Sequence, residues 1–158
     1  MATQENTLEI VRATIDDLEQ LVPLFDGYRQ FYKQESDLAG ARNFLRAHFE
    51  GNTSVVFLAF RTDEQGQRQA CGFTQLYPSF SSTSMKRIWI LNDLFVTPSA
   101  RRTGTGTALL ERARQFAIET SAKRLTLNTN VDNYTAQSVY EAHGWKRDQE
   151  FYTYHLPV

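Results

Sequence analysis

The chain has 158 residues, of which 41% are hydrophobic and 13% aromatic, and its formal net charge is -1. This length fits one domain over 1–158, because no linker or break in composition divides the chain. The near-zero net charge argues against a general nucleic-acid binder, and no apolar run is long enough to cross a bilayer. The amino terminus lacks the basic and apolar segments of a secretory signal, so we expect a cytoplasmic protein that binds neither nucleic acid nor membrane.

Cysteine and charge narrow the function classes further. The single cysteine, Cys71, permits no internal disulfide, and no Cys/His cluster at metal-ligand spacing accompanies it, so no metal is expected. Residues 1–60 carry five basic and nine acidic side chains, and the rest of the chain is basic on balance. The asymmetry suits a cationic ligand on the first half and an anionic ligand on the second, although solvated surface charge explains the counts equally well.

The first half of the chain predicts a strand, two helices and a hairpin. Apolar and polar residues alternate over 8–14, which is typical of a strand. Apolar residues recur at helical spacing over 15–34 after the helix-start pair Thr14 and Asp17, with Pro23 as a bend or boundary, and a second short helix is expected over 38–50. Residues 53–60 and 70–80 are then predicted to be two antiparallel strands around a polar turn.

The second half predicts a long strand followed by alternating helices and strands. The stretch 86–96, KRIWILNDLFV, is rich in β-branched and aromatic residues, but Asn92 and Asp93 interrupt it. Because an unpaired buried carboxylate is costly, this pair indicates either a bulge or a lined cavity. A helix over 107–120, a strand over 124–131, a helix over 133–144 that ends at Gly144 and a last strand over 150–156 complete the series. The order predicts a mixed α/β sheet with a parallel crossover.

The stretch VTPSARRTGTG, residues 96–106, contains two arginines, two glycines and four hydroxyl side chains. The first N–H groups of a helix have no intrahelical partner, so a glycine-rich turn that opens a helix favours an anion. Gly104 and Gly106 allow a ligand to approach the backbone closely. The stretch lacks the Gly-Lys-Ser/Thr ending of nucleotide triphosphate loops and the third small residue of dinucleotide folds, and Gly-x-Gly alone also fits an ordinary loop.

Two spaced motifs resemble the GCN5-related N-acetyltransferase (GNAT) family. The family's acetyl-CoA loop is similar to Val96-x-Pro98-x-x-Arg101-x-x-Gly104-x-Gly106, which lies between LNDLF and an ALL helix. Its Asn/Tyr helix is similar to Asn133-x-x-Ala136-x-x-x-Tyr140-x-x-x-Gly144-Trp145. The resemblance implies an α/β fold with a mixed, mostly antiparallel sheet, helices on both faces and a splayed parallel strand pair. It also implies acetyl-CoA as co-substrate.

The resemblance further implies contacts to acetyl-CoA. Backbone N–H groups from Arg102 to Thr107 would hold the pyrophosphate, Arg101 and Arg102 would add charge beside it, and residues 94–96 would pair with the pantetheine arm. The expected contacts are Leu94, Phe95, Val96, Arg101, Arg102, Thr103, Gly104, Thr105, Gly106, Thr107, Asn133 and Ala136. For either arginine, a solvated surface position is the alternative.

Acetyl transfer to an amine requires a free amine, an oxyanion donor and an acid for the leaving sulfur. Tyr140 matches the family's acid. A primary amine with a pKa of about 10.4 is mostly protonated at neutral pH, and freeing it costs roughly 4 to 5 kcal/mol, so a proton acceptor is needed. We assign this role to Asp93, directly or through water, with a purely structural carboxylate as the alternative. Asn92 cannot accept a proton and is assigned to hydrogen bonding; polyamine members can carry Glu-Asp at this pair, so Asn-Asp is a departure.

The acceptor is expected to meet the first half of the chain. Tyr28 and Tyr32, with acidic residues nearby, resemble the early helix of polyamine and histone-type members, and aromatic faces and carboxylates suit ammonium groups. Core packing is the alternative explanation for these rings. Asn92 is the third predicted contact to the acceptor. The sequence predicts direct acetyl transfer to a small polyamine or diamine. It also predicts a homodimer that pairs through residues 150–156. The alternatives are a protein lysine or amino terminus as acceptor, and a CoA-binding module without turnover.

Overall fold

The computed structural model describes residues 7–158. The prediction that the amino terminus is not a secretory signal concerns residues 1–6 in part, and these lie outside the described residues. The chain divides into two compact units, the first ending at Leu127 and the second spanning Asn128–Val158. Each unit is described by itself below. A single domain over 1–158 stays a prediction.

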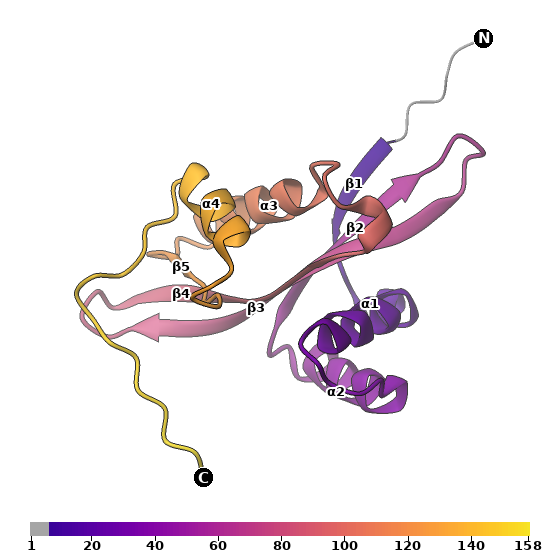
Figure 1. Cartoon of the computed structure of the whole chain (residues 1–158). Helices are drawn as coiled ribbons and strands as arrows, with labels where there is room; N and C mark the ends of the chain where they lie inside the picture. Colours follow the sequence, from indigo (N-terminus) through magenta and orange to yellow (C-terminus); the bar gives the residue numbers. More distant parts are fainter. Residues whose placement is uncertain (1–6) are drawn as a thin grey trace. The chain divides into compact units, whose positions relative to one another are not determined.

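The first unit is built on a five-stranded sheet in the order β1-β2-β3-β4-β5 (Figure 1). The strands are β1 (Thr7–Arg12), β2 (Val55–Thr62), β3 (Arg68–Ser81), β4 (Lys86–Val96) and β5 (Leu125–Thr126). The pairings from β1 to β4 are antiparallel, and β4 pairs with β5 in parallel. This arrangement confirms the mixed, mostly antiparallel sheet that the sequence predicts.

Helices cover both faces of this sheet. They are α1 (Leu18–Phe31), which follows a 3-10 turn at Ile15–Asp17, then α2 (Leu38–Gly51) and α3 (Thr105–Glu119). On β2, Leu58 and Phe60 belong to the core cluster built with α1 and α2, whereas the Phe57 ring packs on Phe116 of α3 at a centroid distance of 5.5 Å. Because successive strand side chains point to opposite faces, α3 lies on the face opposite α1 and α2, as Figure 1 shows.

Local signals at the start of the first helical segment are confirmed. The Thr14 N–H donates to the Asp17 carboxylate at 2.9 Å, and the Asp16 N–H donates to the Thr14 hydroxyl at 3.3 Å, which together form a capping box. Pro23 lies inside α1 without dividing it. The helix ends at Phe31, short of the predicted residue 34, because Lys33 adopts a left-handed φ of 63°.

Three predictions about helices and strands in the second half are wrong. The strand over 124–131 shrinks to Leu125–Thr126, and α3 begins at Thr105 rather than at residue 107. No strand forms over 150–156, whose side chains are exposed. Alternating apolar and polar residues show that a segment is able to form a strand, but a strand exists only where a neighbour supplies the hydrogen bonds.

The second unit contains α4 (Tyr134–Ala142) and confirms the helix predicted there. The Asn133 side chain accepts a hydrogen bond from the Ala136 N–H at 3.2 Å, which caps the start of the helix. After the helix, Gly144 has a φ of 89° and provides the predicted stop. The Trp145 N–H then donates to the Tyr140 carbonyl at 3.0 Å.

No helix within residues 7–158 is both long enough and apolar enough to cross a membrane. The cytoplasmic location stays a prediction.

Candidate active site

A β-bulge in β4 separates the environments of Asn92 and Asp93. Gln75 pairs with Asp93 and Leu76 pairs with Leu91, so Asn92 is the extra residue on β4. Asn92 is exposed, whereas Asp93 is only 3% exposed. Of the two explanations that the sequence allows for this polar pair, the bulge is confirmed.

Two side-chain amides hold the buried carboxylate of Asp93. The Gln75 Nε2 donates to Oδ2 at 2.6 Å, and the Asn92 Nδ2 donates to Oδ1 at 2.9 Å. The Thr74 hydroxyl donates to the main-chain carbonyl of Asp93 at 2.8 Å. A carboxylate has about four lone-pair sites, so Asp93 is still able to accept a further hydrogen bond.

Gln75 is a site residue that the sequence does not reveal. Its side chain is fully buried, and its Nε2 also donates to the Tyr77 hydroxyl at 3.1 Å. The Gln75 Oε1 accepts no hydrogen bond within the described part of the chain. Gln75 lies opposite Asp93 because of the register in which β3 pairs with β4, and the bulge in β4 shifts that register by one residue. A local sequence pattern does not predict which residue of β3 lies opposite Asp93.

Two phenols face the Asp93 carboxylate. Tyr28 on α1 donates its hydroxyl to the Asn92 carbonyl at 3.3 Å, and burial followed by the charge of Asp93 raises the pKa of Tyr28. Burial, and then the charge of Asp93, raises the pKa of Tyr77 to about 12. Both phenols therefore stay protonated at neutral pH. The structure thus brings Tyr28 and Asn92 together with Asp93.

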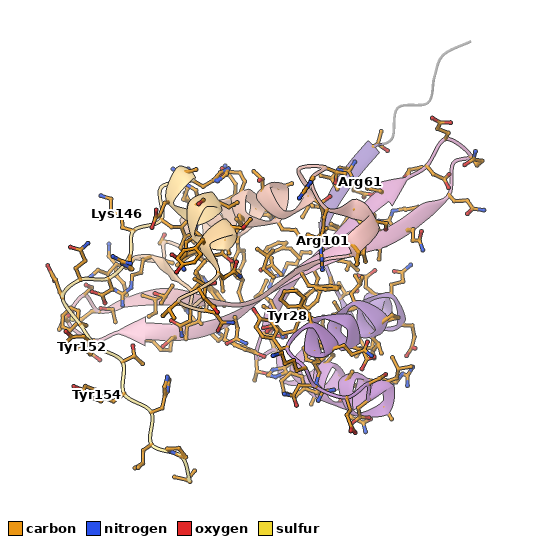
Figure 2. The ribbon with its side chains drawn as sticks, in the orientation of Figure 1. Tyr28, Arg61, Arg101, Lys146, Tyr152 and Tyr154 are labelled. Carbon is orange, nitrogen blue, oxygen red and sulfur yellow. The ribbon has the colours of Figure 1, made fainter. Side chains whose placement is uncertain are left out.

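Tyr28 also links this carboxylate to an aromatic cluster. Its ring centroid lies 5.0 Å from that of Tyr32 and 6.0 Å from that of Phe73, both in edge contacts. Figure 2 shows Tyr28 on α1, on the side that faces the sheet. Tyr28 is partly explained by core packing, whereas Tyr32 is 46% exposed.

Two acidic residues near these rings, Asp26 and Asp37, have structural partners. The buried Asp26 carboxylate accepts hydrogen bonds from the Ser36 hydroxyl at 2.7 Å and the Asp37 N–H at 2.8 Å. The Asp37 carboxylate accepts from the Gly40 N–H at 2.8 Å and so caps α2. These two carboxylates therefore fix the connection between α1 and α2.

The arginine and glycine stretch forms the turn that opens α3. Gly104 immediately precedes the helix with a φ of 84°, a conformation that favours glycine, and no side chain caps the helix. The first N–H groups of α3 are therefore available to an anion. The turn and the first helical positions contain Thr103, Gly104, Thr105, Gly106 and Thr107, which is where the sequence predicts the anion contacts.

The two arginines of this stretch lie in different surroundings. The Arg101 Nε donates to the Val96 carbonyl at 3.1 Å, and its guanidinium lies 5.7 Å from the Phe31 ring centroid and 5.9 Å from that of Phe95. Arg102 is exposed and has a left-handed φ of 61°. Arg101 therefore ties the turn to α1 and β4. A role for either arginine beside the phosphates stays a prediction.

The end of β4 has an unpaired edge. Its parallel partner, β5, pairs with it only at Trp89 and Ile90, so within residues 7–158 the segment 91–96 has no strand neighbour on that side. Main-chain groups of Leu94, Phe95 and Val96 are therefore placed where an extended ligand arm is able to pair with a strand.

The second unit contains the other residues that the sequence predicts to have site roles. Tyr140 is half-buried and its ring centroid lies 6.0 Å from that of Trp145. Asn133 and Ala136 bond to each other at the start of α4. Their roles toward substrates stay predictions. Among the residues that the structure describes, no group of three or more His, Cys, Asp or Glu side chains is placed to hold a metal ion.

Residues 18–145 match the model of the Acetyltransferase (GNAT) family. The chain belongs to this family. The match confirms the GNAT family that the two motifs resemble. The protein is therefore an acetyl-CoA-dependent N-acetyltransferase, because GNAT enzymes use this donor. The open N-terminus of α3 and the unpaired edge of β4 are features of this GNAT fold that suit such a donor.

Several individual acetyltransferases are similar to this chain over most of their length. The chain is 48% identical over 151 residues to an uncharacterized N-acetyltransferase, YhfO, of Bacillus subtilis (strain 168), covering 96% of this chain and 98% of that protein. It is also 47% identical to a probable acetyltransferase of known crystal structure, with a TM-score of 0.88. That similarity covers 95% of this chain and 97% of the other. A thialysine N-epsilon-acetyltransferase of Caenorhabditis elegans is 26% identical over 133 residues, covering 84% of this chain and 79% of that protein.

Proposed function

We propose that this GNAT enzyme transfers the acetyl group of acetyl-CoA directly to a primary amine of a small polyamine or diamine. The observation that carries the proposal is the buried Asp93 carboxylate, held by Gln75 and Asn92 beside the aromatic ring of Tyr28. A carboxylate next to aromatic rings attracts an ammonium group and is able to take its proton.

Asp93 acts as the general base in this proposal. The ammonium group gives one proton to the carboxylate, directly or through water, and the free amine attacks the thioester carbon. A C–N bond forms as the C–S bond breaks, and the Tyr140 hydroxyl gives its proton to the departing thiolate. The acylated nitrogen then releases its second proton, which restores the Tyr140 hydroxyl and leaves a neutral amide. The hydroxyl of Tyr28 and the side chain of Asn92 orient the amine by hydrogen bonding. No acyl group is carried by the enzyme at any stage.

The donor is assigned to the turn before α3 and the end of β4. The N–H groups from Arg102 to Thr107 hold the pyrophosphate, with the charge of Arg101 and Arg102 beside it, and residues 94–96 pair with the pantetheine arm. The glycine conformation at Gly104 and the uncapped start of α3 support this assignment. Asn133 and Ala136, on the second unit, are also assigned to acetyl-CoA.

A small amine with two cationic groups fits the acceptor side. One nitrogen reacts at Asp93, while a second stays charged against the exposed ring of Tyr32. The Caenorhabditis elegans relative, named for the ε-nitrogen of thialysine, supports a small amine as acceptor. Asp26 and Asp37 already have structural partners, so the second nitrogen is bound through aromatic contact rather than through those carboxylates.

The test is release of the CoA thiol from acetyl-CoA with spermidine, diamines, free lysine, aminoglycosides and lysine-containing or amino-terminal peptides. We expect kcat/KM for spermidine or a diamine to exceed that for every peptide by about tenfold or more, which corresponds to roughly 1.4 kcal/mol. Preference for a peptide would favour a protein acetyltransferase. Binding of acetyl-CoA without turnover on any amine would favour a CoA-binding module.

We also infer that the enzyme forms a homodimer through residues 150–156. This segment is exposed, and Figure 2 shows Tyr152 and Tyr154 along it. An extended segment with aromatic side chains is able to pair with the sheet edge of a second copy. We expect light scattering to give twice the mass of one chain and Tyr154→Asp to give a monomer. A monomeric parent protein at micromolar concentration would contradict the inference.

A further inference from the structure

Arg61 on β2 reaches the turn that opens α3, although it lies outside both sequence motifs. Its Nη2 donates to the Thr103 carbonyl at 2.7 Å, across a sequence separation of 42 residues. Its Nε and Nη2 each lie 3.3 Å from the hydroxyl oxygen of Thr105, a residue that is 1% exposed. Figure 2 shows Arg61 beside this turn.

These contacts belong to one chain of hydrogen bonds. The Thr103 hydroxyl donates to the Ala100 carbonyl, and the hydroxyl oxygens of Thr103 and Thr105 lie 3.1 Å apart. The Thr105 oxygen in turn accepts from Arg61. These contacts connect Arg61 through Thr105 and Thr103 to Ala100. The guanidinium therefore holds the turn at residue 103 and at the first residue of α3.

The bond to the Thr103 carbonyl also sets the direction of the next N–H. In a trans peptide the carbonyl and the following N–H point in opposite directions. Because Arg61 holds the Thr103 carbonyl toward β2, the Gly104 N–H points away from β2. Gly104 has a φ of 84° and is followed by the uncapped first turn of α3, so this N–H joins those that are available to an anion.

The charge of Arg61 is also available to a ligand. Within residues 7–158 no carboxylate lies at ion-pair distance from it, whereas Arg68 on the neighbouring strand β3 is paired with Glu9 at 3.0 Å. The half-buried guanidinium bonds a carbonyl and a hydroxyl, neither of which carries a negative charge.

We propose that Arg61 is a positioning residue for the pyrophosphate of acetyl-CoA, which it serves by holding the Thr103 carbonyl so that the Gly104 N–H faces the phosphates. The role rests on the proposed donor site. It concerns only the pyrophosphate, because the contacts of Arg61 lie on the turn and the start of α3, not on the edge of β4 that is assigned to pantetheine.

The test compares two donors in Arg61→Met and Arg61→Lys. S-acetylpantetheine has the thioester and the arm of acetyl-CoA but lacks the pyrophosphate. With the best amine of the panel, we expect Arg61→Met to raise KM for acetyl-CoA by about tenfold or more, and KM for S-acetylpantetheine and kcat to change by less than about twofold. Arg61→Lys keeps the charge but not the fork of donors, so an intermediate rise is expected.

Calorimetric Kd for CoA provides a readout that does not depend on turnover, and it should rise in parallel with KM. Arg68→Met is the matched control, because this arginine lies on the next strand with its charge paired to Glu9; its Kd for CoA should equal that of the parent protein. An equal rise in KM for both donors, or an unchanged Kd in Arg61→Met, would overturn the proposed role. If the parent protein does not bind CoA, the donor site itself is wrong.

Discussion

Replacing Asp93 by asparagine is expected to lower kcat/KM for the acceptor amine by about hundredfold or more at neutral pH, the range found for general bases. The substitution keeps the size of the side chain, and the Gln75 Nε2 is still able to donate to the amide oxygen. What is lost is the group that accepts the proton of the ammonium. The variant therefore depends on the small fraction of amine that is already free in solution.

This dependence gives a pH signature. The free fraction of an amine with a pKa of about 10.4 rises tenfold per pH unit below that value, so the rate of Asp93→Asn should rise with pH more steeply than that of the parent enzyme. Tyr28 and Tyr77 do not produce this rise, because burial and the charge of Asp93 raise both pKa values, that of Tyr77 to about 12. The measurement is kcat/KM between about pH 7 and 9.

Thr74→Val is the matched control for Asp93→Asn. It removes a buried hydrogen bond to the main-chain carbonyl of Asp93 and leaves the carboxylate intact. We expect it to lower the thermal unfolding temperature without changing the slope of rate against pH. If Asp93→Asn unfolds at a lower temperature but keeps the parent's kcat/KM and slope, Asp93 is a structural carboxylate and another group takes the proton.

Removing the Tyr140 hydroxyl is expected to have the other large effect. Tyr140→Phe should lower kcat by about 10²- to 10⁴-fold, because the thiolate then leaves without a proton donor. The ring contact with Trp145 is retained, and the Kd for acetyl-CoA should stay within about twofold of the parent value, as expected for an interaction made only in the transition state.

Tyr134→Phe on the same helix serves as the control for Tyr140→Phe. Tyr134 is 72% exposed at the first position of α4, and loss of its hydroxyl should leave kcat unchanged. A kcat for Tyr140→Phe equal to that of the parent enzyme would exclude Tyr140 as the acid. A parallel fall in kcat for both variants would point to a disturbance of α4 rather than to acid catalysis.

Local sequence patterns predict the features of this enzyme that depend on near neighbours. Thr14 and Asp17 form the predicted cap, and Gly144 ends α4, because each feature involves residues no more than a few positions apart. The polar pair in an apolar strand also indicates a bulge or a lined cavity at Asn92 and Asp93, and the structure shows the bulge. The sheet class and the helix layers follow from the order of these elements.

Features that depend on distant pairing are not visible in the sequence. Gln75 meets Asp93 across 18 positions, and Arg61 meets Thr103 across 42, so neither contact produces a periodic pattern. The segment 150–156 has the alternation of a strand but no secondary structure, since alternation specifies which residues would share a face and not whether a partner strand exists.

The central claim is direct acetyl transfer from acetyl-CoA to a small amine. The most direct measurement is mass spectrometry of both the amine and the intact protein, sampled during turnover with spermidine and acetyl-CoA. We expect acetylated spermidine to accumulate in step with released CoA while the protein keeps its unmodified mass. An acetylated protein that forms and decays at the rate of turnover, or CoA release without any acetylated spermidine, would contradict the claim.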